Sequence, residues 1–135
     1  MVRTPPEIAA DYALALDRED YARARALLDL GCVYLVRGER HEGPDSIIQS
    51  YKGNGDEAGR RFDSIEYAST VRADGADSAV IGFTDDIRHG GRRLVHNCEQ
   101  RVKIGPGGLI IGIEHIDLPG ELERLERFKA ECGFA

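Results

Sequence analysis

Three side chains that can exchange protons cluster near the end of the sequence. Glu114, His115 and Asp117 lie within four positions of one another in the segment GIEHIDLPGE, residues 112–121. A carboxylate and an imidazole that reach the same atom suit general acid–base chemistry. Successive side chains of a strand point to opposite faces, so Glu114 is expected on one face and His115 with Asp117 on the other. The three cannot share one pocket if this segment is a regular strand, and Asp117 is expected to cap the helix that follows.

A second polar group lies in the preceding segment, residues 92–104. By the same alternation, Asn97, Glu99 and Arg101 share one face. Burial beside apolar walls raises the pKa of an acid, so that it can donate a proton near neutral pH. Arg101 next to Glu99 would oppose this rise in pKa by stabilising the carboxylate. The alternative is that Glu99 and Arg101 form only an ion-pair network. Both interpretations remain open from the sequence.

The remaining polar signals favour structural roles. No two of the four histidines have the i, i+4 helical spacing of a metal site, so no metal is predicted. His96 and His115 are expected to make structural or subunit contacts. The three cysteines are odd in number and lack zinc-site spacing, which fits reduced thiols in a cytoplasm.

The elements that must position these residues are helices first and then a long sheet, the α+β class. Thr4 and Glu7 form a capping box, which predicts a helix start. A second helix is expected from Tyr21, ended by Gly31, and a helix that opens at Gly43 is expected to be broken by the GNG sequence at 53–55. The segments predicted to be strands are 32–39, 62–72, 77–89, 92–104 and 108–118, with a last helix over 119–130. Short glycine-containing turns join the last four strands, which predicts an antiparallel meander.

Length and charge exclude several classes of protein. A chain of 135 residues has the usual size of one domain, residues 1–135, and can bury a core without disulfides or metals. No apolar run is long enough to span a membrane, and the start lacks a secretory signal. The net charge of −6 argues against nucleic-acid binding. Arg88, Arg92 and Arg93 flank a Gly-Gly turn and are expected at a solvated hairpin tip.

Two segments, DYALALDREDYARARALLDLGCVYLV and GGLIIGIEHIDLPGE, resemble the nuclear-transport-factor-2-like superfamily. This superfamily includes ketosteroid isomerases, limonene epoxide hydrolase and SnoaL-type polyketide cyclases. The resemblance implies a cone-shaped, curved antiparallel sheet wrapped around N-terminal helices (a cystatin-like α+β barrel) that encloses an apolar cavity. It also implies a homodimer packed through the sheet. The superfamily contains enzymes and non-enzymes alike, so the resemblance indicates a fold and not a reaction.

Comparison with ketosteroid isomerase suggests roles for individual residues. Tyr12 matches the tyrosine that binds the substrate oxyanion, and Glu99 matches a protonated acid on the penultimate strand. The catalytic base would fall at about Val36, where no acid stands, so steroid isomerisation is not favoured. Limonene epoxide hydrolase uses an arginine between two carboxylates. The residues of this sequence that most nearly match that set are Glu99, Arg101 and Glu114.

Two functional hypotheses follow. The first is a cofactor-free isomerase, dehydratase, cyclase or hydrolase that acts on a small apolar, polyketide-like or steroid-like molecule by acid–base chemistry. Its catalytic residues would be Tyr12, Glu99 and Glu114, and its substrate-binding residues Tyr34, Tyr67, Asp85, Asn97 and Arg101. The second is a non-catalytic ligand-binding or dimerisation module of the same fold. The missing first-strand carboxylate favours the second hypothesis, and the polar cluster on 92–104 favours the first.

Overall fold

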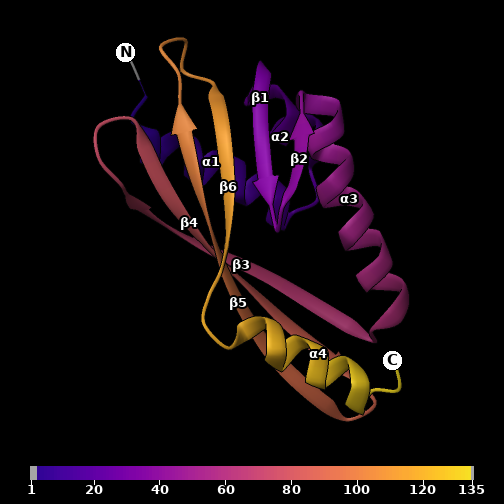
Figure 1. Cartoon of the computed structure of the whole chain (residues 1–135). Helices are drawn as coiled ribbons and strands as arrows, with labels where there is room; N and C mark the ends of the chain where they lie inside the picture. The colour runs from indigo at the N-terminus through magenta and orange to yellow at the C-terminus, as the bar shows by residue number, and fades with distance from the viewer. Residues whose placement is uncertain (1–2, 135) are drawn as a thin grey trace.

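The computed structural model describes residues 3–134 and has the predicted α+β architecture (Figure 1). Its elements are α1 (Pro5–Asp17), α2 (Tyr21–Ala26), β1 (Leu28–Val36), β2 (Glu39–Glu42), α3 (Pro44–Arg61), β3 (Ser64–Ala73), β4 (Ser78–His89), β5 (Arg92–Ile104), β6 (Ile110–Asp117) and α4 (Glu121–Glu131). None of the described helices is long and apolar enough to cross a membrane.

The six strands form one curved, unclosed sheet with the order β2-β1-β6-β5-β4-β3. Strands β3 to β6 form the predicted antiparallel meander. The sheet is mixed, because β6 also pairs in parallel with β1 on its other side, where Tyr34 lies opposite Ile113. Figure 1 shows α3 running beside β1 and β2, and α4 lying across the far ends of the long strands. The last strand of the chain therefore lies in the middle of the sheet.

Helix α1 supplies the main core. Thr4 and Glu7 form the predicted capping box, and Pro5 occupies the first helical position. The inward stripe of α1 includes Ile8 and Tyr12, which are fully buried against α3 and the sheet. A second, smaller cluster of buried residues lies at the other end of the sheet and consists of Phe62, Ile87, Leu94 and Phe128. The sheet is thus covered on its concave side by two separate apolar clusters.

The structure differs from the sequence prediction at two places around β1. Helix α2 ends at Ala26, and Gly31 lies inside β1 instead of ending a helix. The short strand β2 was not predicted. It forms because Arg37 and Gly38 both have positive φ, which makes the two-residue turn that reverses the chain between β1 and β2. The hairpin tip at Gly90–Gly91 was predicted correctly, with Arg88, Arg92 and Arg93 exposed around it.

Helix α3 also continues where a break was expected. It runs through the GNG sequence to Arg61 without interruption. Gly53, Gly55 and Gly59 all lack the positive φ that would mark a helix end. The helix holds because Ile47 and Ile48 anchor its first turns in the core, and this packing outweighs the weak propensity of glycine.

This continuity predicts that alanine stabilises α3. Gly53→Ala and Gly59→Ala place a methyl group in open space within a helix, so each is expected to raise the free energy of unfolding by about 0.5–1 kcal/mol. Urea denaturation followed by circular dichroism measures the change. The control is Gly38→Ala at φ +80, which is expected to destabilise the protein. Unchanged or reduced stability in both helix variants would contradict a continuous α3.

Candidate functional site

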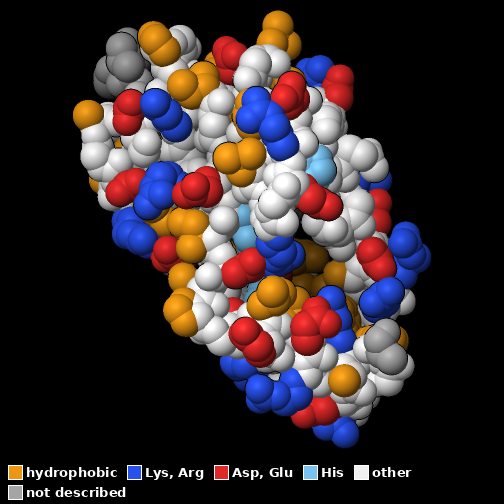
Figure 2. Space-filling view, viewed as in Figure 1, with side chains coloured by type: hydrophobic (Ala, Val, Ile, Leu, Met, Phe, Trp, Pro, Cys, Tyr) orange, Lys and Arg blue, Asp and Glu red, His pale blue; other side chains and the backbone are white. Residues whose placement is uncertain are grey.

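A cavity of about 380 Å³ lies between the two apolar clusters, on the concave side of the sheet. This volume is within the range of small-molecule sites. Figure 2 shows its opening as a hollow with hydrophobic side chains at the bottom and charged side chains around the rim. Its walls are largely aromatic and apolar, and the members used below are Leu16, Tyr21, Tyr34, Tyr51, Phe62, Tyr67 and Phe83. The polar members used below are Asp17, Arg37, Asp85, His96, Cys98, Gln100 and His115, and the lining also includes Glu19, Asn54, Glu57, Arg61 and Lys129.

The face of β5 and β6 that lines the cavity is the opposite of the one expected. His96, Cys98 and Gln100 of β5 and His115 of β6 point inward. The prediction that Asn97, Glu99, Arg101 and Glu114 face the cavity is wrong. The inward side of β5 also carries Leu94, Val102 and Ile104, which are buried in the two clusters, so core packing fixes the orientation of the strand.

On the outer face, the predicted polar residues bind one another and their neighbours. Arg72 donates to Glu99 at 2.8 Å, and this contact lowers the pKa of Glu99. Arg101 contacts Asp74 at 2.8 Å and Glu114 at 3.0 Å. The Thr84 hydroxyl donates to the Asn97 side-chain oxygen at 2.8 Å. This arrangement agrees with the alternative prediction, in which Glu99 and Arg101 only form ion pairs on the surface of the sheet.

Tyr12 is a core residue and does not line the cavity. It is fully buried, and its ring makes an edge contact with Tyr51 at a centroid distance of 6.1 Å. Burial raises the pKa of Tyr12, and its hydroxyl has no hydrogen-bond partner among residues 3–134. Three other predicted site residues do line the cavity, namely Tyr34, Tyr67 and Asp85.

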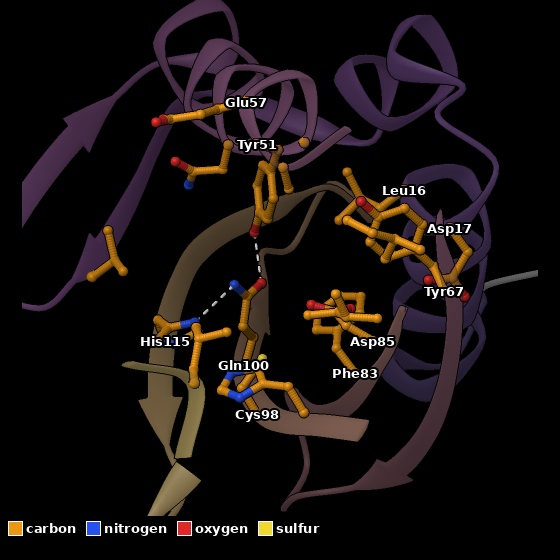
Figure 3. Close-up of a pocket in the computed structure, with 18 of the residues that line it drawn as sticks. Leu16, Asp17, Tyr51, Glu57, Tyr67, Phe83, Asp85, Cys98, Gln100 and His115 are labelled. Carbon is orange, nitrogen blue, oxygen red and sulfur yellow. Dashed lines mark hydrogen bonds between the residues drawn. The ribbon is translucent and has the colours of Figure 1, made fainter. Parts of the chain in front are cut away.

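Asp85 and Asp17 are two neighbouring acids in one wall of the cavity. Figure 3 shows both beside Tyr67, across the cavity from Gln100 and His115. Burial raises the pKa of Asp85 to about 6, and the nearby Asp17 contributes to the shift. Asp17 accepts a hydrogen bond from Ser69 at 2.6 Å, and burial also raises its pKa. Tyr67 lies directly opposite Asp85 on β3, and burial, aided by that carboxylate, raises the pKa of Tyr67 to about 12.

Within the described chain, Asp85 has neither a hydrogen-bond donor nor a cationic partner. Its carboxyl group faces an aromatic wall and would change its protonation state close to neutral pH. A carboxyl group of this kind is half ionised near pH 6, which suits a general base or acid. Asp85 is therefore the proton-transfer candidate of the cavity.

A chain of hydrogen bonds forms the opposite wall. Arg37 makes two bonds of 2.7 Å to Asp117, and these bonds, followed by the one from His115, lower the pKa of Asp117 to about 2. His115 Nε2 is 2.9 Å from Asp117, and its Nδ1 is 3.2 Å from Gln100 Nε2. Gln100 Nε2 also lies 3.0 Å from the Tyr34 hydroxyl oxygen.

The Tyr51 hydroxyl completes this chain by donating to Gln100 Oε1 at 2.6 Å (Figure 3). The expected capping role of Asp117 is wrong, because Arg37 and His115 occupy its carboxylate. The residue at the start of α4 is instead Gly120, in the left-handed conformation.

The two remaining polar residues on the inner face of β5 are poorly suited to catalysis. Burial lowers the pKa of His96, whose Nδ1 lies 3.5 Å from Glu121. Burial raises the pKa of the Cys98 thiol to about 12, so it is not a ready nucleophile. Across residues 3–134, no three His, Cys, Asp or Glu side chains converge as metal ligands would.

Comparisons with known proteins identify the fold. No protein-family model matches the chain, and no curated protein sequence matches it. A proposed polyketide cyclase from Pseudomonas putida KT2440 superposes with a TM-score of 0.66 at 18% identity, covering 89% of this chain and 96% of that one. An LEH-like epoxide hydrolase from M. tuberculosis gives a TM-score of 0.63 at 16% identity, covering 91% and 90%.

A third solved structure is the epoxide hydrolase/cyclase-like enzyme SalBIII, described in pyran ring formation in the polyether salinomycin. It gives a TM-score of 0.65 at 13% identity, covering 85% of this chain and 91% of that one. The chain therefore has the cone-shaped fold of the nuclear-transport-factor-2-like superfamily, as its sequence predicted. At these identities the likeness concerns the fold alone.

The raised pKa of Asp85 predicts a pH-dependent cost to stability. Below the ordinary aspartate pKa of 3.8, Asp85 is neutral in both the folded and the unfolded chain, so it has no effect on stability. Between pH 3.8 and about 6 the unfolded chain ionises this residue while the folded protein keeps it neutral, and the cost to stability grows over this range. Above about pH 6 the folded protein carries the charge in an apolar wall, and the cost is complete. Asp85→Asn removes this cost. It is expected to stabilise the protein by about 1–2 kcal/mol at pH 7, with the gain fading towards pH 4. Urea denaturation of both proteins at pH 4 to 7 measures it, and a gain that does not depend on pH would contradict the shift.

Proposed function

We propose that the cavity binds a small, largely apolar molecule and that Asp85 moves a proton to or from it without a cofactor. The observation that carries this proposal is the Asp85 carboxyl group, which faces the cavity with a pKa of about 6. In its ionised form it accepts a proton from a carbon acid or from a water molecule, and it then returns that proton to the product. The reaction classes that fit are isomerisation, dehydration, cyclisation and hydrolysis.

The shape and walls of the cavity support a substrate of this kind. Tyr67 and Phe83 border Asp85, and Phe62 and Tyr21 extend the apolar surface towards α3 and α2. Such walls bind carbon frameworks through the hydrophobic effect and keep water away from the carboxyl group. The solved structures of the same fold include an epoxide hydrolase-like and a cyclase-like protein, and both names are compatible with acid–base chemistry.

The second candidate is a binding module that keeps the cavity and catalyses nothing. The wall of Gln100 and His115 favours it, because polar groups that are already paired within the protein can hold a ligand without taking part in a reaction. The two candidates differ in one respect: an enzyme of this type loses its reaction when Asp85 is replaced, and a binding module has no reaction to lose.

Two probes separate these candidates. Acetophenone in D₂O reports proton abstraction through deuterium exchange of its methyl group, and styrene oxide in water reports hydrolysis. Exchange or hydrolysis, followed by proton NMR, is expected to rise with pH through about 6, where Asp85 ionises. Asp85→Asn should lower the rate by about 100-fold or more, the usual contribution of a general base.

The outcomes decide between the two functions. Binding of both probes without any reaction would refute the catalytic proposal and favour the binding module. A reaction that persists in Asp85→Asn would show that another group moves the proton. Asp77→Asn is a control at an exposed carboxylate outside the cavity, and it should leave the rate unchanged.

We also propose that the protein forms a homodimer through the outer face of its sheet. The described helices pack on the concave side, and Leu35 projects outward from β1 with 44% of its surface exposed. Light scattering should give about twice the monomer mass of 14.9 kDa. Leu35→Arg is expected to shift the protein towards monomer, while Leu14→Arg, at the equally exposed Leu14 of α1, should not. A wild-type protein of monomer mass at micromolar concentration would refute the dimer.

A further inference from the structure

The hydrogen-bond chain on the cavity wall has a direction, and that direction begins at Asp117. A carboxylate can only accept hydrogen bonds, and Arg37 can only donate them. With both Asp117 oxygens bonded to Arg37 and one of them also 2.9 Å from His115 Nε2, that nitrogen must carry the proton. In neutral His115 the other nitrogen, Nδ1, is therefore an acceptor.

The orientation of Gln100 follows from this tautomer. His115 Nδ1 accepts a hydrogen bond, so the group of Gln100 that faces it at 3.2 Å must be the amide NH₂. The second hydrogen of the same NH₂ group points to the Tyr34 oxygen at 3.0 Å. The amide oxygen then faces Tyr51, whose hydroxyl donates to it at 2.6 Å. Asp117 therefore sets the hydrogen positions on His115, Gln100 and Tyr51.

This order leaves one donor unused. The Tyr34 hydroxyl accepts from Gln100, and it donates to no residue among 3–134. Tyr34 lines the cavity, its ring is stacked on Tyr51 at 5.1 Å with an interplanar angle of 5°, and it is almost completely buried. The stacking and the bond from Gln100 fix the position of the phenol, and its own hydrogen is free for a ligand.

We infer that the Tyr34 hydroxyl is the specificity-determining donor of the cavity and binds an oxygen acceptor on the ligand, a carbonyl or an epoxide. This inference rests on the proposed function and narrows its substrate class. Asp85 and Tyr34 lie on separate strands, β4 and β1, on either side of β5 and β6. A ligand between them would have its oxygen polarised by Tyr34 while Asp85 removes a proton. Arg37, Asp117, His115 and Gln100 are positioning residues that act through Tyr34.

Paired ligands test the inference by binding alone. The probes are acetophenone, labelled with carbon-13 at its carbonyl, and ethylbenzene, which has a similar framework without the oxygen. In Tyr34→Phe, acetophenone should bind about fivefold more weakly, within the range of one neutral hydrogen bond, while ethylbenzene changes by less than about twofold. The carbonyl carbon-13 shift of bound acetophenone should lose the displacement that a donated hydrogen bond causes.

Gln100→Glu is the second variant, and it keeps the shape of the wall. A carboxylate at this position accepts from both Tyr34 and Tyr51, so the free hydrogen of Tyr34 is taken up inside the protein. This variant should therefore reproduce the selective loss of acetophenone binding even though Tyr34 is intact. Tyr12→Phe is the control, because the Tyr12 hydroxyl is buried outside the cavity and has no hydrogen-bond partner among residues 3–134. Its preference for acetophenone should match that of the wild type.

A nitrogen-15 NMR spectrum of the histidines tests the direction of the chain independently of any ligand. We expect His115 to carry its proton on Nε2, and a proton on Nδ1 alone would overturn the inference. An acetophenone preference that survives in both Tyr34→Phe and Gln100→Glu would overturn it while the proposed function stands. Failure of both probes to bind would refute the proposed ligand site and the inference together. Circular dichroism and thermal melting identify any variant that does not fold.

Discussion

The parallel hydrogen bonding between β1 and β6 is the contact on which the rest of the structure depends. It joins the N-terminal half of the chain to the meander of β3 to β6. Neighbouring residues on paired strands share a face, so this register brings Tyr34 next to the inward residues of β5 and β6. It also carries the turn after β1 towards the end of β6, where Arg37 reaches Asp117. One strand pairing thus builds the cavity wall and positions the ion pair that orders its hydrogen bonds.

Those parts of the fold that have local signals could be predicted from the sequence. The capping box at Thr4 and the Gly-Gly hairpin depend on residues close together in the chain, and both were predicted correctly. The turn between β1 and β2 was missed because Arg37 stands at a position where such turns usually have Gly, Asn or Asp. The bidentate bond to Asp117 helps to hold Arg37 in this conformation, and that partner is distant in sequence.

The candidate site was harder to predict, because its groups come from several elements. Glu99 and Glu114 were selected from the pattern of a related fold, but the apolar residues Leu94, Val102 and Ile104 on the other side of β5 already indicated which face is buried. Gln100 carries no charge, so a pattern of acidic residues does not indicate it. Asp17 lies at the end of α1, and only the packing of that helix against β3 reveals that it faces Asp85.

The central place of β6 has a consequence for the newly made chain. On a ribosome, β1 emerges well before β6, and no local turn can bring two parallel strands together. Until β6 inserts between β1 and β5, two strand edges with unpaired backbone groups stay open, and such edges readily pair with other chains. The architecture that creates the pocket therefore leaves the growing chain exposed to aggregation until β6 has been made and has inserted.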